Sequence, residues 1–480
     1  MFKNIFIETL ILFIIIVPTT FLSSCDDSVN PPAGPLYSIS YETNGSDSGD
    51  APIDDKNYAE GDTATVLDSG SLSKSGYSFF SWNTAADHSG QSYSAGDTLE
   101  IKTSDVLLYA HWTLNPTYSV IYSGNGYDSG TAPDDDNEYE ADTEVLAALP
   151  GNMVKTGYTF SGWNTMADGS GTDYTPGEAF AMPSSNINLY ARWIHSSLIN
   201  LEKRDMVTIT GGTFNQKATS GTPDNFDHTI SDFEIARYEL TYEIWYTVHS
   251  WAIANGYTFQ NPGCEGDNGA ITDPAGEPPS TDKWEPVTTV SSRDALIWCN
   301  AYSQMCCYTP CYTYGGNFIK DSRDAAAVTC DNAACDWNAN GYRLPTEGER
   351  YFAATGRGIT PYNFASGASA DYSDAAATQK VAWYGVNAGG HTHVVGTTDN
   401  SSAMNLWDMS GNMQEWCWDF SGNYPVTDQI DYRGAAVSSG RMCPGGKWTN
   451  AATDTQCGHR AAAIVTFAVP TIGLRVARYR

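Results

Sequence analysis

The sequence predicts an α+β protein in which small all-β units precede one larger domain of mixed helices and strands. Three observations support this fold class. An internal repeat occupies much of the first half, and every landmark recurs 81 residues later, as Tyr37 does at Tyr118. Within each copy, aromatic and polar residues alternate with the period of two that is typical of strands. After Asp205, helical spacings and helix-capping residues appear between glycine-rich turns.

The beginning of the chain has the pattern of an exported lipoprotein. Lys3 precedes the apolar run Leu10–Val17, which is too short to cross a bilayer as a helix. The segment Leu22–Cys25 resembles a bacterial lipobox, which implies cleavage before Cys25 and membrane anchoring through a lipid on its thiol. An ordinary secretory signal is the alternative. We expect a signal peptide at residues 1–24 and a linker at residues 25–36.

Composition agrees with a protein of the cell envelope, facing the surface or the periplasm. The 480 residues include 25 Lys and Arg against 56 Asp and Glu, which gives a net charge of −31. Because nucleic acids repel such an acidic chain, no nucleic-acid partner is expected. The 11 cysteines include Cys25. The others are even in number, as is typical of disulfide-bonded proteins in an oxidising compartment.

The two copies of the repeat are predicted to form separate modules at residues 37–113 and 118–193. GYSFFSWNT at residues 76–84 returns as GYTFSGWNT at residues 157–165. A unit of this size must bury its tryptophans and tyrosines in order to fold, so we assign these side chains to the cores. The pattern resembles the Listeria–Bacteroides repeat of bacterial surface proteins. The resemblance implies a β-grasp-like fold and a role as a stalk or adhesive spacer.

A connector at residues 194–204 leads into a domain predicted at residues 205–480. Its helices are indicated by apolar residues at spacings of three and four and by capping residues at their starts. The predicted elements are two strands around a glycine turn in 205–214, a strand and a helix in 233–248 with Thr241 as cap, a helix around 295–302, and a helix after the capping box of Thr346 and Glu349.

The segment Asn405–Trp416, NLWDMSGNMQEW, combines turn formers, large apolar residues and oxygen donors. Calcium takes about six to eight oxygen ligands from carboxylates and from carbonyl groups in turns. Asp408 and Glu415 could supply two carboxylates, and Gly411 and Met413 two backbone oxygens. The alternative is a buried turn whose polar side chains cap its own backbone.

The order of these motifs resembles the sulfatase-modifying-factor family, whose catalytic members are formylglycine-generating enzymes. The resemblance implies an irregular α+β domain with a C-type-lectin-like core. It also implies a structural calcium ion on Asp408, Gly411, Met413 and Glu415. The matching segments are Met206–Phe214, Asp294–Cys299, Gly341–Arg350, Asn405–Trp416, Gly445–Trp448 and Gly473–Arg478.

The catalytic members oxidise a substrate cysteine with two active-site cysteines five positions apart, which hold copper(I) through their thiolates. In this chain no cysteine lies between Trp448 and Cys457. The resemblance assigns Cys457 instead to a structural disulfide with Cys299. The paired active-site cysteines are therefore not found, so no catalytic residue is assigned and copper is not expected.

Two further groups of potential metal ligands remain open. His391 and His393 stand close enough in sequence to share a metal, but no third ligand is placed by the sequence, and hydrogen-bonded histidines are the alternative. An insertion holds five cysteines that suggest either zinc or disulfides, with Cys264, Cys417 or Cys443 as further partners. The five are Cys306, Cys307, Cys311, Cys330 and Cys335.

These observations predict a lipid-anchored surface protein whose C-terminal domain is a non-catalytic binding or structural module on a repeat stalk. Its ligand would be a surface protein, a glycan or a cell-wall component. An exported enzyme with the family fold and altered chemistry is the alternative, and a structural subunit of a surface complex is a third. Because unrelated functions share one fold, the residues of the site must decide between them.

Overall fold

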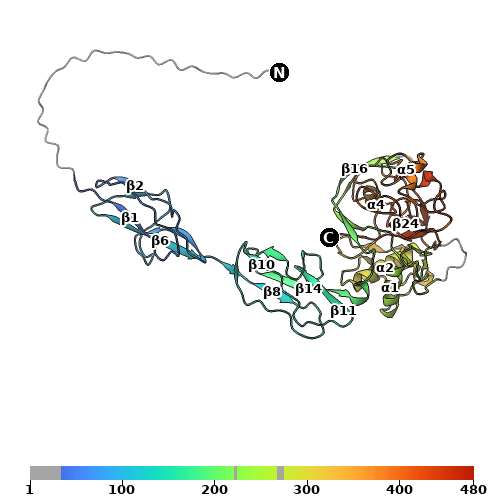
Figure 1. Cartoon of the computed structure of the whole chain (residues 1–480), viewed down its shortest axis with the longest axis horizontal. Helices are drawn as coiled ribbons and strands as arrows, with labels where there is room; N and C mark the ends of the chain where they lie inside the picture. Colours follow the sequence, from blue (N-terminus) through green and yellow to red (C-terminus); the bar gives the residue numbers. More distant parts are fainter. Residues whose placement is uncertain (1–33, 221–223, 268–274, 480) are drawn as a thin grey trace, which may run out of the picture. The chain divides into compact units, whose positions relative to one another are not determined.

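The computed structural model describes residues 34–220, 224–267 and 275–479, so the predicted signal peptide and Cys25 lie outside the described residues. The described residues form two compact units, one that ends at Pro116 and one that begins at Thr117. The first unit contains the first repeat, and the second contains the second repeat and the C-terminal domain (Figure 1). Over the described ranges, no helix has the length and apolar character needed to cross a membrane.

Each repeat has the same strand topology. In the first repeat, β1 and β6 are parallel, β3 is antiparallel to β6, and β4 extends the sheet from β3. A separate pair, β2 and β5, completes the module. The strands are β1 (Ile39–Glu42), β2 (Thr63–Thr65), β3 (Tyr77–Asn83), β4 (Ser92–Tyr93), β5 (Thr98–Glu100) and β6 (Val106–Leu114).

The second repeat reproduces this arrangement 81 residues later. Ile39 pairs with Val106 in the first copy, and Val120 pairs with Ile187 in the second. An added short strand, β7 (Thr117–Tyr118), pairs with β9. The remaining strands are β8 (Val120–Ser123), β9 (Tyr139–Glu140), β10 (Glu144–Leu146), β11 (Tyr158–Asn164), β12 (Asp173–Tyr174), β13 (Ala179–Ala181) and β14 (Ile187–His195).

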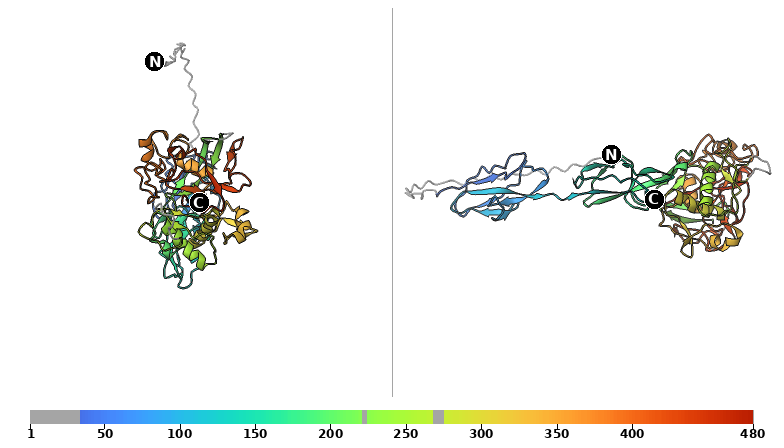
Figure 2. Two further views of the ribbon diagram at one scale, coloured as in Figure 1. Left: turned by 90° about the vertical axis from the view of Figure 1, so that its right-hand side faces the viewer. Right: turned by 90° about the horizontal axis from the view of Figure 1, so that it is seen from below.

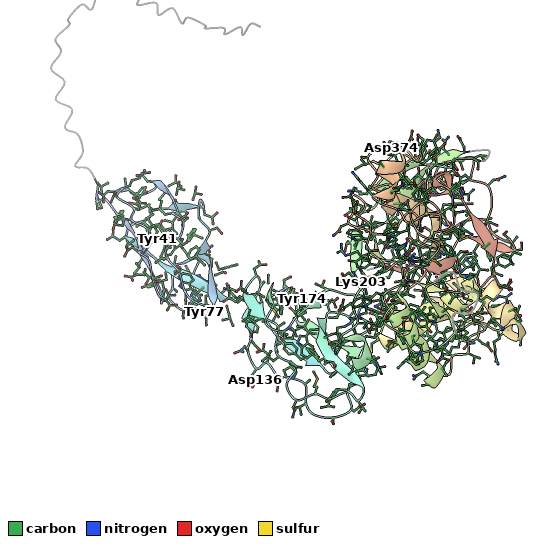
Figure 3. The ribbon with its side chains drawn as sticks, turned by 45° about the vertical axis from the view of Figure 1, so that its right-hand side comes forward. Tyr41, Tyr77, Asp136, Tyr174, Lys203 and Asp374 are labelled. Atoms are coloured by element: carbon green, nitrogen blue, oxygen red, sulfur yellow. The ribbon has the colours of Figure 1, made fainter. Side chains whose placement is uncertain are left out.

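The aromatic landmarks of the repeats are core residues, as predicted. Trp82 and Trp163 are fully buried, and each indole N–H donates to a backbone carbonyl, that of Leu67 or Ala148. Tyr41, labelled in Figure 3, packs edge-on against Trp82 with ring centroids 4.7 Å apart. Buried aromatic rings of this size dominate the stability of small domains, so both copies keep the same aromatic positions.

The C-terminal domain, green-yellow to red in Figure 2, contains all the α-helices of the described residues. These are α1 (Tyr242–Ala254), α2 (Ser292–Met305), α3 (Ala327–Asp331), α4 (Glu347–Ala354) and α5 (Ala375–Gln379), with single 3₁₀ turns at η1 (Ser196–Leu198), η2 (Asp324–Ala326) and η3 (Ala452–Asp454).

The strands of this domain are short and fall into several small sheets, which is typical of an irregular α+β fold. Three sheets have three strands: β15 (Met206–Ile209), β18 (Phe233–Ala236) and β29 (Ala477–Arg478); β16 (Gly212–Lys217), β17 (Asn225–Ile230) and β25 (Gln429–Ile430); β22 (Asn317–Phe318), β21 (Tyr312–Tyr314) and β23 (Ala334–Cys335). Three have two: β19 (Cys264–Glu265) with β20 (Val287–Thr288), β24 (Gln414–Trp416) with β28 (Ile472–Leu474), and β26 (Gly440–Met442) with β27 (Ala462–Ile464).

The helices begin where the capping residues predict, with one difference in how they are capped. Thr346 and Glu349 form the predicted capping box of α4, in which each side chain binds the other residue's backbone N–H at 3.0 and 2.8 Å. Thr241 stands at the N-cap of α1, but its hydroxyl makes no capping hydrogen bond. The prediction that this side chain caps the helix was therefore wrong. The backbone of Tyr242 instead donates to the Glu285 carbonyl.

The second repeat contacts the C-terminal domain through side chains from an insertion between α2 and α4. The guanidinium carbon of Arg192 lies 4.4 Å from the centre of the Tyr308 ring. Asn340 donates a hydrogen bond to the Asp168 carbonyl at 2.6 Å. Both contacts lie within residues 117–480, so the second repeat packs on this domain directly.

Candidate functional site

The segment Asn405–Trp416 forms a tight bend that leads into β24. Asn405, Asp408 and Asn412 adopt left-handed φ angles of 57°, 56° and 53°, a region that asparagine and aspartate tolerate better than other side chains. Gly411 has φ +79°, and a Cβ atom there would lie 2.3 Å from the Trp383 carbonyl oxygen. The turn formers of this motif are therefore required by the backbone.

Glu415 lies at the centre of a buried network of charges. The residue is fully buried, and Oε2 accepts a hydrogen bond from Arg350 Nε at 2.6 Å. Arg475 donates two hydrogen bonds to Oε1, at 2.8 and 3.1 Å. Both arginine side chains are at least 98% buried. Each oxygen of this carboxylate therefore already has a positively charged partner.

The same arginines also bind the backbone of the bend. Arg350 donates to the Met409 carbonyl at 2.9 Å, and Arg475 donates to the Trp407 carbonyl at 2.7 Å. Since α4 supplies Arg350 and the segment after β28 supplies Arg475, the bend is held between two distant parts of the chain. The network therefore fixes the conformation of residues 407–415.

Two further buried carboxylates belong to this network. Glu239 accepts hydrogen bonds from the Asn412 side chain at 2.6 Å and from the Met413 backbone at 3.0 Å. Asp408 Oδ2 accepts from the Gly396 backbone at 2.6 Å. Its other oxygen, Oδ1, is buried and has no hydrogen-bond partner among the described residues. The network thus contains three carboxylates and two guanidinium groups.

The pKa values of these groups follow from burial and from the uneven number of charges. Burial raises the pKa of Asp408 to about 6. Burial, together with repulsion from Asp408 and Glu415, holds the pKa of Glu239 well above its usual range. Burial would also raise the pKa of Glu415, but Arg350 and Arg475 outweigh it, so the pKa of this residue is lowered. Glu415 is therefore the most readily ionised member of the network.

The four predicted calcium ligands lie in this network, but they are not arranged equally well for a cation. Glu415 has both oxygens bound by arginines, whereas Asp408 Oδ1 is buried without a partner in the described part of the chain. Gly411 and Met413 supply the turn between them. A calcium ion would have to compete with a guanidinium group for Glu415. The calcium site stays a prediction, and a chelator that lowers the melting temperature would support it.

The cysteines nearest to the family's catalytic segment are buried thiols. Cys443 and Cys457 flank the run Gly445–Trp448, and they are 1% and 7% exposed. Burial raises the pKa of each to about 12, so both are protonated at neutral pH. Copper(I) is held by thiolates, which require a low pKa or a metal to stabilise the charge. The residues present therefore do not fit a copper ion bound by a thiolate pair.

The predicted disulfide between Cys299 and Cys457 is not formed, and both residues are free thiols. Cys299 lies in the core around α1 and α2, while Cys457 lies in a separate core cluster around α4. The Cys457 thiol donates to the Ala354 carbonyl at 3.8 Å. The two thiols belong to different core clusters, and their pairing stays a prediction that peptide mapping without reduction would test.

His391 and His393 lie together without completing a metal site. Their ring centroids are 4.5 Å apart, and His393 stacks on Trp383 at 3.8 Å. His393 Nε2 also lies 3.0 Å from the Ala388 carbonyl oxygen. Over residues 34–220, 224–267 and 275–479, no cluster of three or more His, Cys, Asp or Glu side chains could hold a metal ion. Both histidines thus have local partners of their own.

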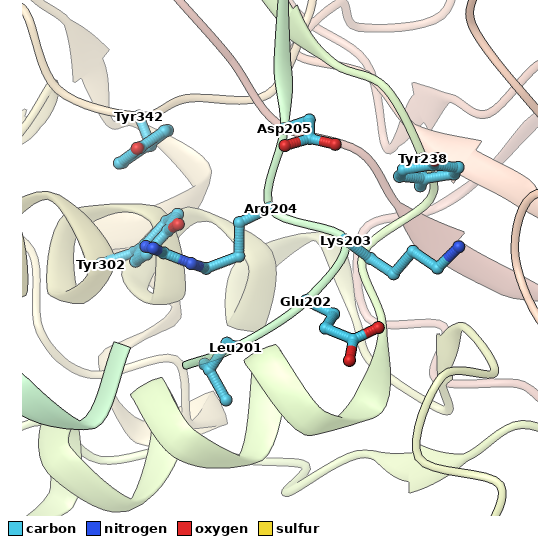
Figure 4. Close-up of a pocket in the computed structure, with 8 residues that line it drawn as sticks. All are labelled: Leu201, Glu202, Lys203, Arg204, Asp205, Tyr238, Tyr302 and Tyr342. Atoms are coloured by element: carbon cyan, nitrogen blue, oxygen red, sulfur yellow. The ribbon is translucent and has the colours of Figure 1, made fainter. Parts of the chain in front are cut away.

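A polar cavity of about 500 Å³ opens beside the connector that precedes β15. Its lining combines three tyrosines with four charged side chains, and Figure 4 shows the Arg204 guanidinium directed at Tyr302 while the Lys203 side chain extends the opposite way, towards Tyr238. The lining residues are Leu201, Glu202, Lys203, Arg204, Asp205, Tyr238, Tyr302 and Tyr342.

Sequence reasoning missed this cavity and most of the charge network. The only signal of the cavity in the connector is its run of four consecutive charged residues, Glu202 to Asp205. Arg350 and Arg475 stand inside two of the family motifs, but nothing in the sequence pairs them with Glu415. Glu239 lies in the predicted segment 233–248, outside the segments that match the family, and is 173 residues from its partner Asn412.

Comparison with known proteins places both halves of the chain. The model of the sulfatase-modifying factor enzyme 1-like domain matches residues 195–480. The Listeria-Bacteroides repeat model matches residues 37–111 and 118–192. These matches confirm the two resemblances read from the sequence and the α+β fold class.

Individual relatives share parts of the chain. A "Putative Gly-rich membrane protein" of Evansella cellulosilytica is 41% identical over 162 residues, which are 33% of this chain but only 18% of that protein. A "Chaperone protein LppX" of Paenibacillus barcinonensis is 29% identical over 299 residues, 57% of this chain and 89% of that one. The chain thus spans about a fifth of the length of the first relative.

Among solved structures, "Treponema denticola variable protein 1" has a TM-score of 0.46 at 27% identity, covering 57% of this chain and 95% of that one. The family model covers more than half of the chain, and its motifs form the buried network around Glu415. The chain therefore belongs to the sulfatase-modifying factor enzyme 1-like family, with two Listeria-Bacteroides repeats ahead of the family domain.

Proposed function

We propose that this is an envelope protein, anchored by a lipid on Cys25, whose C-terminal domain binds a ligand without catalysing a reaction. The two repeats act as the stalk that presents this domain. The relatives named as membrane proteins support an envelope location. The proposal combines a fold held by a buried charge network, a catalytic segment without a reactive thiol, and a polar cavity beside the connector.

The state of the thiols is the observation that carries the non-catalytic part. Oxidation of a substrate cysteine through copper needs two thiolates that can bind the metal and exchange with the substrate. Cys443 and Cys457 are almost fully buried, and burial raises the pKa of both to about 12. Neither thiol is in a position to exchange with a peptide from solvent.

The cavity of Figure 4 supports the binding part. Its volume of about 500 Å³ lies within the range of small-molecule sites. The Arg204 Nε atom is buried without a hydrogen-bond partner in the part of the chain that the structure describes. Lys203 has φ +59°, a conformation that costs energy for lysine and often marks a functional position. Both features indicate a surface prepared for a ligand.

The chemistry of the lining favours a glycan of the cell surface or cell wall. Tyr302 and Tyr342 are buried and stack on each other with ring centroids 4.1 Å apart, so the charged side chains would hold a glycan through hydrogen bonds with its hydroxyl groups. Lys203 Nζ lies 4.6 Å from the centre of the Tyr238 ring, so one wall presents an ammonium group above an aromatic face. Because the connector carries two acidic and two basic residues, the lining suits a polar rather than a strongly charged ligand.

The catalytic alternative is tested by mass spectrometry of a Cys-x-Pro-x-Arg peptide incubated with the purified chain, copper, oxygen and a reductant. We expect no aldehyde product, while an active formylglycine-generating enzyme converts the same peptide in parallel. Conversion by this chain would contradict the non-catalytic proposal. Loss of that conversion in Cys443→Ser or Cys457→Ser would then identify the thiol responsible.

Binding is tested by co-sedimentation of the chain, released from the membrane by Cys25→Ser, with purified cell-wall sacculi and their attached polysaccharides. Lys203→Ala is expected to weaken binding about five-fold, because it removes a contact worth about 1 kcal/mol. Lys320→Ala is the matched control, since Lys320 also lies over a tyrosine ring, that of Tyr257 at 4.8 Å, outside the cavity. Equal binding by both variants would exclude the cavity, and absence of binding by the parent chain would exclude this ligand class.

A further inference from the structure

The insertion between α2 and α4 carries two thiols that lie side by side. Cys311 immediately precedes β21, and Cys335 ends β23. The two strands are antiparallel, with Tyr312 opposite Cys335. The Asp336 backbone N–H donates to the Cys311 carbonyl at 2.8 Å, so the pairing continues beyond the strands. The strand register therefore places the two cysteines diagonally across one pair of strands.

The side chains of this pair also meet. A hydrogen bond joins the Cys311 and Cys335 thiols. The Cys311 thiol further lies 3.2 Å from the Gly341 carbonyl oxygen, at the far end of the insertion. The hydrogen bond with the Cys335 thiol, with a smaller contribution from Arg343, lowers the pKa of Cys311 despite its burial. Cys311 is thus the more readily ionised of the two.

We propose that Cys311 and Cys335 form a disulfide bond once the chain reaches an oxidising compartment. The bond would close the hairpin of β21 and β23 at its base, and its loop would contain β22, η2 and α3. Because Cys311 lies just before β21, outside the regular pairing, its thiol reaches the Cys335 thiol across adjacent backbones, and little further movement is needed to reach the geometry of a disulfide. The pairing is distinct from the bond between Cys299 and Cys457 that the family resemblance implies.

The oxidant we assign is a protein disulfide that exchanges with newly exported chains. The Cys311 thiolate attacks one sulfur of that disulfide and displaces the other as a thiolate, which gives a mixed disulfide. The Cys335 thiolate then attacks the Cys311 sulfur and releases, as a thiolate, the oxidant sulfur that Cys311 had bound in the mixed disulfide. The chain gives up two electrons and two protons, and the oxidant becomes a dithiol. Because Cys311 is buried in the finished fold, the exchange takes place before the insertion packs.

The bond has a consequence for the contact with the second repeat. Tyr308, whose ring is contacted by the Arg192 guanidinium, lies just before Cys311. Asn340, which donates to the Asp168 carbonyl, lies shortly after Cys335. A bond between the two cysteines would tie these two contact points to each other. The oxidised insertion would therefore hold the second repeat more firmly than the reduced one.

A third thiol provides a direct competitor. Cys299 on α2 lies near Cys311. Burial is the main reason that the pKa of Cys299 is raised, and repulsion from Cys311 adds to it. Asn300, the next residue, forms two hydrogen bonds with the Tyr312 backbone and so holds α2 against β21. Cys299 and Cys335 are thus two alternatives for Cys311. The hydrogen bond between the two thiols favours Cys335.

The test is peptide mapping of the full chain isolated from the cell envelope, alkylated without reduction. We expect one linked pair of peptides containing Cys311 and Cys335, which separates on reduction. Alkylated Cys311 and Cys335, or a linkage of Cys311 to Cys299, would overturn the proposal. Because this measurement uses the parent chain, it does not depend on whether a variant folds.

A second measurement tests the consequence. Reduction is expected to lower the melting temperature of the parent chain by about 5 °C and to speed tryptic cleavage after Lys203 or Arg204. Reduction should leave Cys335→Ser unchanged in both assays, while the control Cys330→Ser should respond as the parent does. Cys330 is buried in the same insertion, and its thiol lies near the Asp321 carbonyl instead. An identical response of Cys335→Ser and the parent would contradict the proposed bond.

Discussion

Replacement of Arg475 by methionine is expected to lower the free energy of unfolding by about 3–5 kcal/mol, because it leaves a buried carboxylate without one of its partners. Arg475 is fully buried and makes two hydrogen bonds to Glu415. Burial raises the pKa of both Glu239 and Asp408, and the charge of Arg475 partly offsets this rise. After the replacement, Arg350 alone would face three buried carboxylates. The variant should unfold at a lower denaturant concentration with an unchanged slope.

The matched control is Arg323→Met. The Arg323 side chain is 52% exposed and pairs with Asp321 at 2.6 Å, and exposed pairs contribute about 1 kcal/mol or less. The deficit of Arg475→Met should also narrow below about pH 6, where buried carboxyl groups such as Asp408 take up protons. A loss below about 1 kcal/mol at pH 7.5 would mean that another cation, such as calcium, balances the network.

Acidification from pH 7 to pH 4 is expected to cost about 3 kcal/mol through His228 alone. His228 on β17 is fully buried, and burial lowers its pKa to about 4. The Tyr432 backbone donates to Nε2 at 2.9 Å, so Nδ1 carries the proton and donates to Gln216 at 2.7 Å. A second proton on Nε2 would break the bond from Tyr432 and place a charge among aromatic rings.

The sign follows from comparing the two states. An unfolded histidine takes up a proton near pH 6.5, whereas the folded His228 does so only near pH 4. Between these values the unfolded state binds more protons, so stability is present above pH 6.5 and is lost as the pH falls. Since each pKa unit corresponds to about 1.4 kcal/mol, the difference gives the expected loss.

The measurement is the free energy of unfolding from denaturant titrations between pH 7 and pH 4. His228→Gln is expected to be less stable at pH 7, but its stability should fall by about 3 kcal/mol less over this range. Glutamine can still accept a hydrogen bond from the Tyr432 backbone without taking up a proton. His391→Gln, a partly exposed histidine on a loop, is the control. Parallel pH profiles for the parent and His228→Gln would contradict the assignment.

The repeats are the part of the fold that local sequence patterns predicted best. Their period of 81 residues and their alternating aromatics predicted two modules with equivalent cores, and Trp82 and Trp163 are buried in the same way. This prediction succeeded because a small sheet has one buried face, and a period of two specifies which side chains occupy it. The capping box of Thr346 and Glu349 succeeded for a similar reason, since both partners lie within one turn.

The charge network shows where local pattern ends. The turn at Gly411 and the carboxylate of Glu415 were visible as a motif, but the hydrogen-bond partners of Glu415 come from positions 65 and 60 residues away. A carboxylate beside a turn is equally suited to calcium or to arginine. Only the packing of α4 and the segment after β28 brings two guanidinium groups to it.

The sequence by itself therefore determined the family, the two repeats, the α+β fold class and the elements whose signals lie within a few residues of one another. The tertiary structure alone decided which charges face Glu415, which thiols are neighbours, and where the connector lines a cavity. The physical reason is that burial makes a polar group depend on its partner, and long-range packing, which leaves no mark in local spacing, selects that partner.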